Sequence, residues 1–220
     1  MARESFRQEL DQIHLQVELV AARVDAALQR MHEVLRTGDL SVAGEAIAAD
    51  DQIDAMVVSL TERVYDLMAR EAPVASDLRY LVSVVRVLEG LERIGDLALR
   101  VVKQTSGKAL ASQDAELFAT LDEMALVARE VYRLALDAWA AEEPTSAGVL
   151  AERSSSVDAA YGRLIDRVLR LQGPGAVPLA VAAVLVGRAL ERIADHTVIV
   201  GERLQYLLTG DPAHLASEVR

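Results

Sequence analysis

The sequence contains no cysteine. This absence excludes disulfide bonds, iron–sulfur clusters and metal sites built on thiolates. It is also typical of proteins in a reducing compartment, so we expect a cytoplasmic location. Aromatic residues make up only 4% of the 220 residues, whereas 52% are hydrophobic. Ala, Leu, Val, Glu and Arg dominate, and this usage is typical of long packed helices rather than of sheets.

Long hydrophobic runs are also absent. The longest uncharged apolar run, residues 176–187, contains Pro178 and is shorter than the roughly 20 residues that a membrane-spanning helix needs. No signal-peptide core is present near the start, because charges interrupt it at Arg3, Glu4, Arg7, Glu9 and Asp11. We therefore expect the protein to meet a membrane only through its partners.

Positive charge is scarce, with 23 Lys and Arg residues against 34 Asp and Glu residues and a formal net charge of −11. Sequence-independent nucleic-acid binding needs a basic footprint, so this function is not expected. Capture of free phosphate by long-range attraction is disfavoured for the same reason. The charge balance favours the binding of cations.

A six-residue motif occurs twice. Residues 91–96 read Leu-Glu-Arg-Ile-Gly-Asp, and residues 190–195 read Leu-Glu-Arg-Ile-Ala-Asp, at a distance of 99 positions, the difference between 190 and 91. Such a repeat predicts two similar halves. Each copy places two carboxylates four residues apart on one helix face. Like charges at this spacing destabilise a helix by a few tenths of a kcal/mol unless a positive group lies between them.

Apolar residues recur at steps of three and four along six stretches, which predicts six long helices. The stretches are Glu4–Arg36, Ser41–Glu71, Ser76–Thr105, Gln113–Ala141, Ala147–Gln172 and Val177–Thr209. We expect an all-α fold with two repeated antiparallel three-helix bundles, residues 1–107 and 112–210, and a loose C-terminal tail, residues 211–220. The last helix is the richest in apolar and small residues, so we expect it to be buried on several sides.

Acids interrupt the apolar faces of the second and third helices. In an antiparallel hairpin, residues equidistant from the turn lie level with one another. With the turn centred on Pro73, Asp54 lies level with Glu92, and Asp50 lies level with Asp96. We therefore predict that these four carboxylates meet in core positions on the inner faces of the two helices.

The fifth and sixth helices repeat this arrangement with one change. Around the turn at residues 173–175, Asp158 lies level with Glu191, and Ser154 lies level with Asp195. Grouped carboxylates either acquire raised pKa values or bind a cation. Oxygen ligands suit Mg, Mn, Ca or Fe and tolerate Zn, so the sequence predicts metal ions without specifying one. Because serine replaces an acid, we predict that the second site is weaker, mononuclear or absent.

An alternative explanation is a structural ion-pair network, in which the acids are neutralised by Arg79, Arg93, Arg188 or Arg192. The recurrence of the acids with hairpin pairing favours metal binding over this network. The histidines show no ligand spacing: we expect His196 to have a structural or surface role, and we place His14, His32 and His214 on the surface. Apolar faces carry two large aromatic residues that we assign to packing, Trp139 and Tyr161.

The doubled motif resembles the PhoU family of phosphate-signalling proteins, and so does the segment Ala-Pro-Val-Ala-Ser-Asp-Leu-Arg at residues 72–79. The resemblance extends over nearly the whole chain. It implies two three-helix bundles that carry multinuclear metal clusters on the acidic motifs. It also implies a negative regulator of the phosphate-starvation response that links the ATPase of a Pst-type phosphate ABC transporter to a sensor histidine kinase. The chain departs from the family at Ser154 and at residues 176–178.

Three functions are therefore compared. The first is a non-enzymatic metal-binding regulator that acts through protein contacts and forms a homodimer, with a shared surface at Val127, Val131, Leu134, Leu136 and Trp139. The second is a carboxylate-bridged di-metal oxidase or hydrolase. The Glu-x-x-His pairs of ferritin-like sites and a nucleophile beside a base are both missing from the sequence. The third is a purely structural helical adaptor, which leaves the acids on the apolar faces unexplained.

Overall fold

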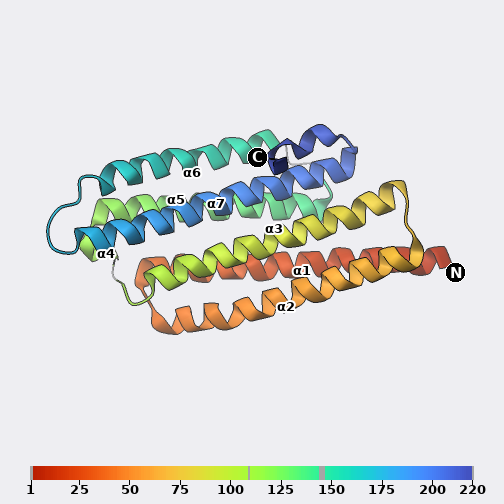
Figure 1. The fold of residues 1–220 in the computed structure, drawn as a ribbon, viewed down its shortest axis with the longest axis horizontal. Coiled ribbons are helices and arrows are strands. Elements are labelled where there is room, and N and C mark those ends of the chain that lie inside the picture. Colours follow the sequence, from red (N-terminus) through yellow and green to blue (C-terminus); the bar gives the residue numbers. More distant parts are fainter. Residues whose placement is uncertain (1, 109, 144–146, 220) are drawn as a thin grey trace.

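The computed structural model describes residues 2–108, 110–143 and 147–219. The predicted all-α fold is confirmed, and the described ranges contain no strand (Figure 1). The helices are α1 (Ala2–Thr37), α2 (Leu40–Glu71), α3 (Ala75–Thr105), α4 (Leu110–Gln113), α5 (Ala115–Ala141), α6 (Ala147–Val168), α7 (Ala176–Thr209) and the 3-10 helix η1 (Pro212–Val219). None of these helices combines the length and the apolar character that crossing a membrane requires.

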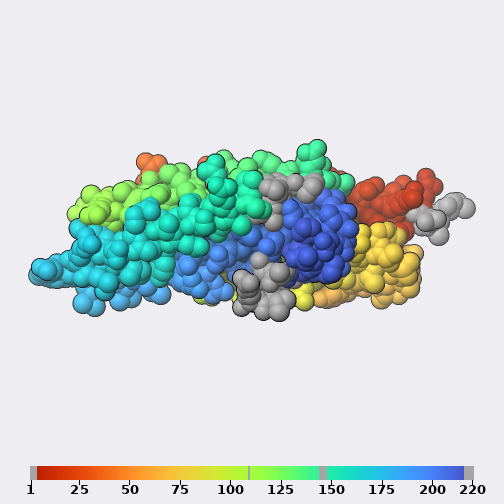
Figure 2. All heavy atoms as spheres, turned by 90° about the horizontal axis from the view of Figure 1, so that it is seen from above, coloured from red at the N-terminus to blue at the C-terminus, as the bar shows by residue number. Residues whose placement is uncertain are grey.

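The long helices form two antiparallel three-helix bundles, as the repeat predicts. The first contains α1, α2 and α3, and the second contains α5, α6 and α7. The bundles lie side by side and are displaced along their length, so that the α2–α3 turn extends beyond one end of the second bundle and the α6–α7 turn beyond the opposite end of the first (Figures 1 and 2). Because α3 packs on α7 and α1 packs on α5, one apolar core runs through both bundles.

The buried face of α1 shows why these stretches are helical. Its fully or nearly fully buried apolar residues follow one another at steps of three and four, which places them along a single stripe of the helix. They are Ile13, Val17, Val20, Val24, Leu28, Met31 and Leu35. Burial of each large aliphatic side chain contributes about 1.5–3 kcal/mol, so the stripe holds α1 against the rest of its bundle.

The turn between α1 and α2 depends on a glycine. Gly38 has a φ of 70°, a left-handed conformation that follows the end of α1. A Cβ atom at this position would lie 2.7 Å from the carbonyl oxygen of Lys108, and the amide of Gly107 donates to the carbonyl of Gly38 at 2.8 Å. The α1–α2 turn and the segment after α3 therefore meet backbone against backbone. Asp39 then caps α2 by accepting from the amides of Ser41 and Val42.

Two helix boundaries differ from the expectation. The predicted fourth helix corresponds to α5 and begins at Ala115 rather than at Gln113, because the carboxylate of Asp114 accepts from the amide of Leu117 at 2.9 Å and caps the helix there. The short helix α4 precedes it, in the segment that joins the two bundles. The predicted fifth helix ends at Val168, because the chain then tightens into hydrogen bonds that span three residues, such as that from Arg170 to Arg167 at 3.0 Å.

The beginning of α3 and the end of the chain also differ. The third helix was expected to begin at Ser76, but it begins at Ala75 behind Val74, which provides no side-chain cap. Asp77 lies in the first turn, where its negative charge is favourable for the helix dipole. The expectation of a loose tail is also wrong for residues 212–219, which form η1 and pack on α7.

The last long helix is buried on several sides, as predicted. It contacts α3, α5, α6 and η1. Small residues allow these close approaches, and the contact with α3 gives a clear example. A Cβ atom added to Gly90 of α3 would lie 2.9 Å from Cγ2 of Val200 on α7. The absence of a side chain at Gly90 therefore permits the short separation between the two central helices.

Candidate metal centres

The first acidic cluster lies on α2 and α3. Asp50 and Asp54 are one turn apart on α2, and Glu92 and Asp96 are one turn apart on α3. The carboxylate of Asp50 lies over α3, where a Cβ atom at Gly95 would be 3.8 Å from its Oδ1 atom. The structure thus places Asp50 beside the residue that precedes Asp96, as the hairpin alignment predicts.

The electrostatics show that the four carboxylates of this cluster act on one another. Burial, together with the charges of Asp54 and Asp96, raises the pKa of Asp50 to about 6, although Lys103 opposes this rise. Burial and the charge of Asp96 also raise the pKa of Asp54 and that of Glu92. The surrounding protein therefore compensates the negative charge of the cluster only in part.

The expectation that the acids take core positions is wrong. On α2 the buried residues of this stretch are Ile53 and Val57, whereas Asp54 is exposed and Asp50 is half-buried. Glu92 and Asp96 are also half-buried. The reason is that neighbouring helical residues are rotated by about 100°, so an acid next to an apolar stripe lies at its border. The cluster is consequently open to ions from solvent.

The second cluster contains Asp158 on α6 with Glu191 and Asp195 on α7. Burial, followed by the charge of Glu191, raises the pKa of Asp158. Burial, followed by the charges of Asp158 and Glu191, raises the pKa of Asp195. Ser154, which stands where the first half has an acid, is 6% exposed. This cluster therefore has one carboxylate fewer than the first, with a buried hydroxyl in its place.

Arginine pairing differs between the two clusters. Arg188 donates to the carboxylate of Glu191 in the second cluster. In the first cluster the nearest ion pair joins Arg93 to its neighbour Glu92 at 3.8 Å. Arg79, a further candidate for neutralising the acids, donates instead to the carbonyl of Leu207 at 3.2 Å. The ion-pair explanation therefore applies to part of the second cluster and to little of the first.

The donor chemistry of both clusters fits a hard cation. Their ligands would be carboxylate oxygens, which Mg, Ca, Mn and oxygen-ligated Fe prefer. Within the described ranges, no three His, Asp or Glu side chains already converge on a single point where they could hold a metal ion. Binding would therefore require the half-buried and exposed carboxylates to reorient, which their position at the border of the core allows.

The family model described as "PhoU domain" matches residues 17–105 and 121–204, which is more than half of the chain. The chain belongs to the PhoU family. The two matched stretches lie one in each bundle, and the first contains the acids of α2 and α3.

Several relatives in the PhoU family match the chain over nearly its whole length. A protein of Mycobacterium tuberculosis named phosphate-specific transport system accessory protein PhoU homolog 1 is 26% identical over 212 residues, which cover 94% of this chain and 95% of the relative. The PhoU homolog of Rhizobium meliloti is 26% identical over 208 residues, covering 94% and 88%. The PhoU protein of Serratia marcescens is 24% identical over 216 residues, covering 97% and 88%.

Crystal structures of PhoU proteins share this architecture. The structure of PhoU from Pseudomonas aeruginosa superimposes with a TM-score of 0.85 and 26% identity. The alignment covers 94% of this chain and 100% of the Pseudomonas chain. The phosphate transport system regulatory protein PhoU from Streptococcus pneumoniae gives a TM-score of 0.81 at 24% identity, covering 94% and 98%. The second comparison supports the fold alone.

One histidine of this PhoU-family chain corrects an expectation, and one aromatic residue confirms another. His32 is 7% exposed rather than on the surface, and its Nε2 atom lies 2.7 Å from Asp122 of α5. Its position between Leu28 and Leu35 on the apolar stripe of α1 was the signal that could have shown this. Trp139 is buried, as predicted for a packing residue, and stacks on the ring of His14.

The dimer surface predicted on the fourth helix includes two residues that are buried within the single chain. Val131 is fully buried and Trp139 is 3% exposed within the single chain. Both belong to α5, which packs against α1, α6 and α7. Val131 packs with residues of α5, α6 and α7 inside the second bundle, and Trp139 packs on His14 of α1, so neither side chain can meet a second copy.

Proposed function

We propose that this chain is a non-catalytic, metal-binding regulator of phosphate uptake that represses the phosphate-starvation response. The observation that carries the proposal is the pair of acidic clusters at corresponding places in the two bundles. In each cluster, the pKa values of several carboxyl groups are raised. The printed names of its relatives, accessory proteins of phosphate-specific transport, support the link to phosphate. The level of sequence identity and the near-complete coverage support transfer of this role.

A bound cation would supply the positive charge that the first cluster lacks. Asp50 and Asp54 would approach it from α2, and Glu92 and Asp96 would approach it from α3. Because the ligands come from two helices, the ion would also hold the two helices together at this point. Metal binding would then change the stability of a surface of the first bundle, which is a physical route from ion occupancy to partner binding.

The metal part of the proposal is tested by measuring the metal content of the purified protein. Glu92→Gln and Asp96→Asn each remove a charged ligand at nearly constant volume, so both variants should retain less metal per chain than the wild type. Glu62→Gln is a matched control, because Glu62 is an exposed acid of α2 outside the cluster. Unchanged metal content in both cluster variants would exclude this site.

The regulatory part is tested in cells and in solution. We propose that the protein acts in the cytoplasm and binds the ATPase of a phosphate ABC transporter and a sensor histidine kinase. Deletion of its gene should switch on phosphate-starvation genes at high phosphate, and tagged protein should capture one or both partners. If the genes stay repressed and neither partner is captured, the regulator proposal is wrong and a di-metal enzyme should be tested next.

Self-association is a separate part of the proposal. We propose a homodimer, because long helices present extended surfaces and several large apolar side chains outside α5 are exposed, among them Leu15, Leu19, Val58 and Tyr65. Sedimentation equilibrium over a range of protein concentrations measures the association directly. A mass that stays at that of one chain at all concentrations contradicts the dimer.

A further inference from the structure

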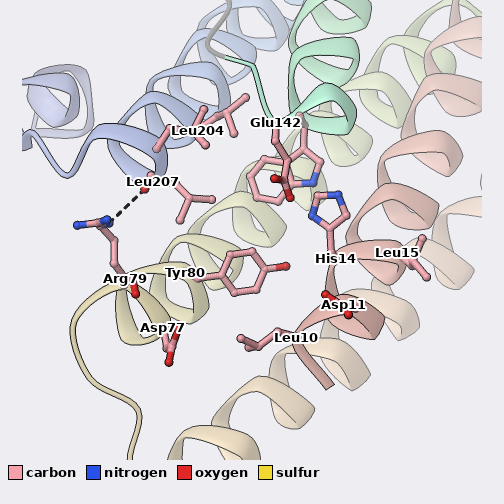
Figure 3. A pocket seen from close by; sticks show the side chains of 13 residues that line it. Leu10, Asp11, His14, Leu15, Asp77, Arg79, Tyr80, Glu142, Leu204 and Leu207 are labelled. Atoms are coloured by element: carbon pink, nitrogen blue, oxygen red, sulfur yellow. Dashed lines mark hydrogen bonds between the residues drawn. The ribbon is translucent and has the colours of Figure 1, made fainter. Parts of the chain in front are cut away.

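A cavity of about 590 Å³ opens between the two bundles, and its walls come from α1, α3, α5 and α7 (Figure 3). None of the seven acids of the candidate metal centres lines it. Pockets of about 300–1,000 Å³ are the usual size for small-molecule sites. Its apolar walls are formed by leucine side chains from α1 and α7, including Leu10, Leu204 and Leu207.

Aromatic side chains form one wall of this cavity. The ring of His14 stacks on that of Trp139, with ring centres 5.9 Å apart and planes inclined by 13°. The hydroxyl of Tyr80 points from α3 across the cavity towards His14 (Figure 3). Faces of aromatic rings attract cations through their quadrupoles, and an aromatic wall is the usual means of binding an organic ammonium group.

Two polar atoms of this wall are buried without a hydrogen-bond partner. They are the hydroxyl of Tyr80 and the indole Nε1 of Trp139, a residue that is only 3% exposed. A buried polar group left unpaired is destabilising, and most such groups in proteins have a partner. Of these two atoms, the hydroxyl oxygen of Tyr80 can accept a hydrogen bond from an N–H group of a ligand, whereas the indole N–H of Trp139 can only donate.

Negative charge surrounds the aromatic wall. Asp11, Asp77 and Glu142 line the cavity, and within the described ranges none of them forms an ion pair with a lysine or an arginine. After burial, the charges of Glu142 and Asp11 are the main causes that raise the pKa of Tyr80, so both carboxylates act on the centre of the wall. The basic residue of the lining, Arg79, donates its Nε–H to the carbonyl of Leu207.

We propose that this cavity binds an organic cation, an ammonium or guanidinium group carried on an apolar body. The leucines would bury the apolar part, and the rings of Tyr80 and Trp139 with the carboxylates of Asp11 and Glu142 would bind the charged part. The same chemistry occurs in a free amine and in a lysine side chain of a partner helix. The proposal does not depend on metal binding, because the two sites share no residue.

The test uses the fluorescence of Trp139, which is the single tryptophan of the chain. Phenethylammonium is titrated into the full-length protein and compared with 2-phenylethanol, which has a similar shape without the charge. We expect a saturable fluorescence change with the amine and an affinity for the alcohol that is lower by about tenfold, the factor that corresponds to about 1.4 kcal/mol. Raised salt should weaken binding of the amine and leave that of the alcohol unchanged.

Variants connect the binding to the named carboxylates. Asp11→Asn combined with Glu142→Gln should lower the affinity for phenethylammonium to that for the alcohol, whereas Glu62→Gln should change neither. An amphipathic helical peptide of leucine and lysine forms a second arm of the test. Binding of the amine shows a site for free amines, and binding of the peptide alone shows a site for a partner's lysine. Equal affinities for amine and alcohol, or no binding of amine and peptide, would overturn the proposal.

Discussion

Replacement of Asp50 by asparagine should stabilise the metal-free protein at neutral pH. Folded Asp50 retains its proton up to about pH 6, whereas an unfolded aspartate releases its proton near the ordinary value of 3.8. Between these two values the folded state binds more protons than the unfolded state, so this residue makes stability fall as pH rises. The contribution is most favourable below the unfolded pKa and is lost as pH rises through the folded pKa. Asparagine cannot ionise, so the variant escapes this loss.

The magnitude follows from the rise in the pKa of Asp50. A rise from 3.8 to about 6 corresponds to about 3 kcal/mol as an upper bound, since one pKa unit is about 1.4 kcal/mol. Asp50 is only half-buried, and solvent screening reduces the expected gain to about 1–2 kcal/mol. A gain of this size is a large fraction of the roughly 5–15 kcal/mol that stabilises a typical domain.

The assay is urea unfolding followed by circular dichroism, with EDTA present, at several pH values. Asp50→Asn should be more stable than the wild type by about 1–2 kcal/mol at neutral pH, and the difference should disappear at pH values below about 4. Addition of a divalent cation should then stabilise the wild type more than the variant, because the variant has lost a ligand. If the variant is less stable than the wild type at neutral pH without metal, the carboxylates do not repel one another as described and the reasoning is refuted.

Three further predictions concern other parts of the chain. Gly90→Ala should lower the free energy of unfolding by about 1–3 kcal/mol, because its Cβ would lie 2.9 Å from Val200; unchanged urea unfolding would contradict this. Asp114→Ala should lower it by about 1–2 kcal/mol through loss of the α5 cap. The hydrogen bond from Arg167 lowers the pKa of Asp114. The stability that ionised Asp114 contributes is therefore present above the unfolded pKa and should be lost as pH falls through the folded pKa. Urea unfolding at several acid pH values measures this loss. Calorimetric titration of metal should show a stronger first and a weaker second site, because Ser154 removes one charge; equal affinities would disprove this ranking.

The fold could be predicted from the sequence because its signals are local and repeated. Apolar spacing along α1 and the breakers at Gly38 and Pro73 depend on neighbouring residues, and the helices follow them closely. The grouping of the acids could also be predicted, because a short turn forces two helices to be antiparallel and fixes which residues lie level. For Asp50 the structure shows the expected proximity to α3, because its carboxylate would lie 3.8 Å from a Cβ atom at Gly95, the neighbour of Asp96.

Features that depend on how whole helices pack against one another could not be predicted. The core residue Ile53 and the border residue Asp54 are adjacent in the sequence, and the choice between them depends on how α2 is rotated against its neighbours. The apolar stripe of α1 indicates that His32 is buried, but its partner Asp122 comes from the other bundle and could not be read from that stripe. The cavity near Tyr80 has walls from four helices of both bundles, so no periodic pattern within one helix could reveal it.

The packing of α3 on α7 has a consequence for the order of events during synthesis. The apolar face of α3 is complete once residue 105 has been made, but its partner α7 begins only at residue 176 and ends at residue 209. At about 5–20 residues per second, a ribosome needs several seconds to tens of seconds to produce the intervening chain. During this time the nascent first bundle exposes a surface that the finished molecule covers. We therefore expect chains truncated before α7 to be captured by chaperones and to aggregate, and the last long helix to complete the fold.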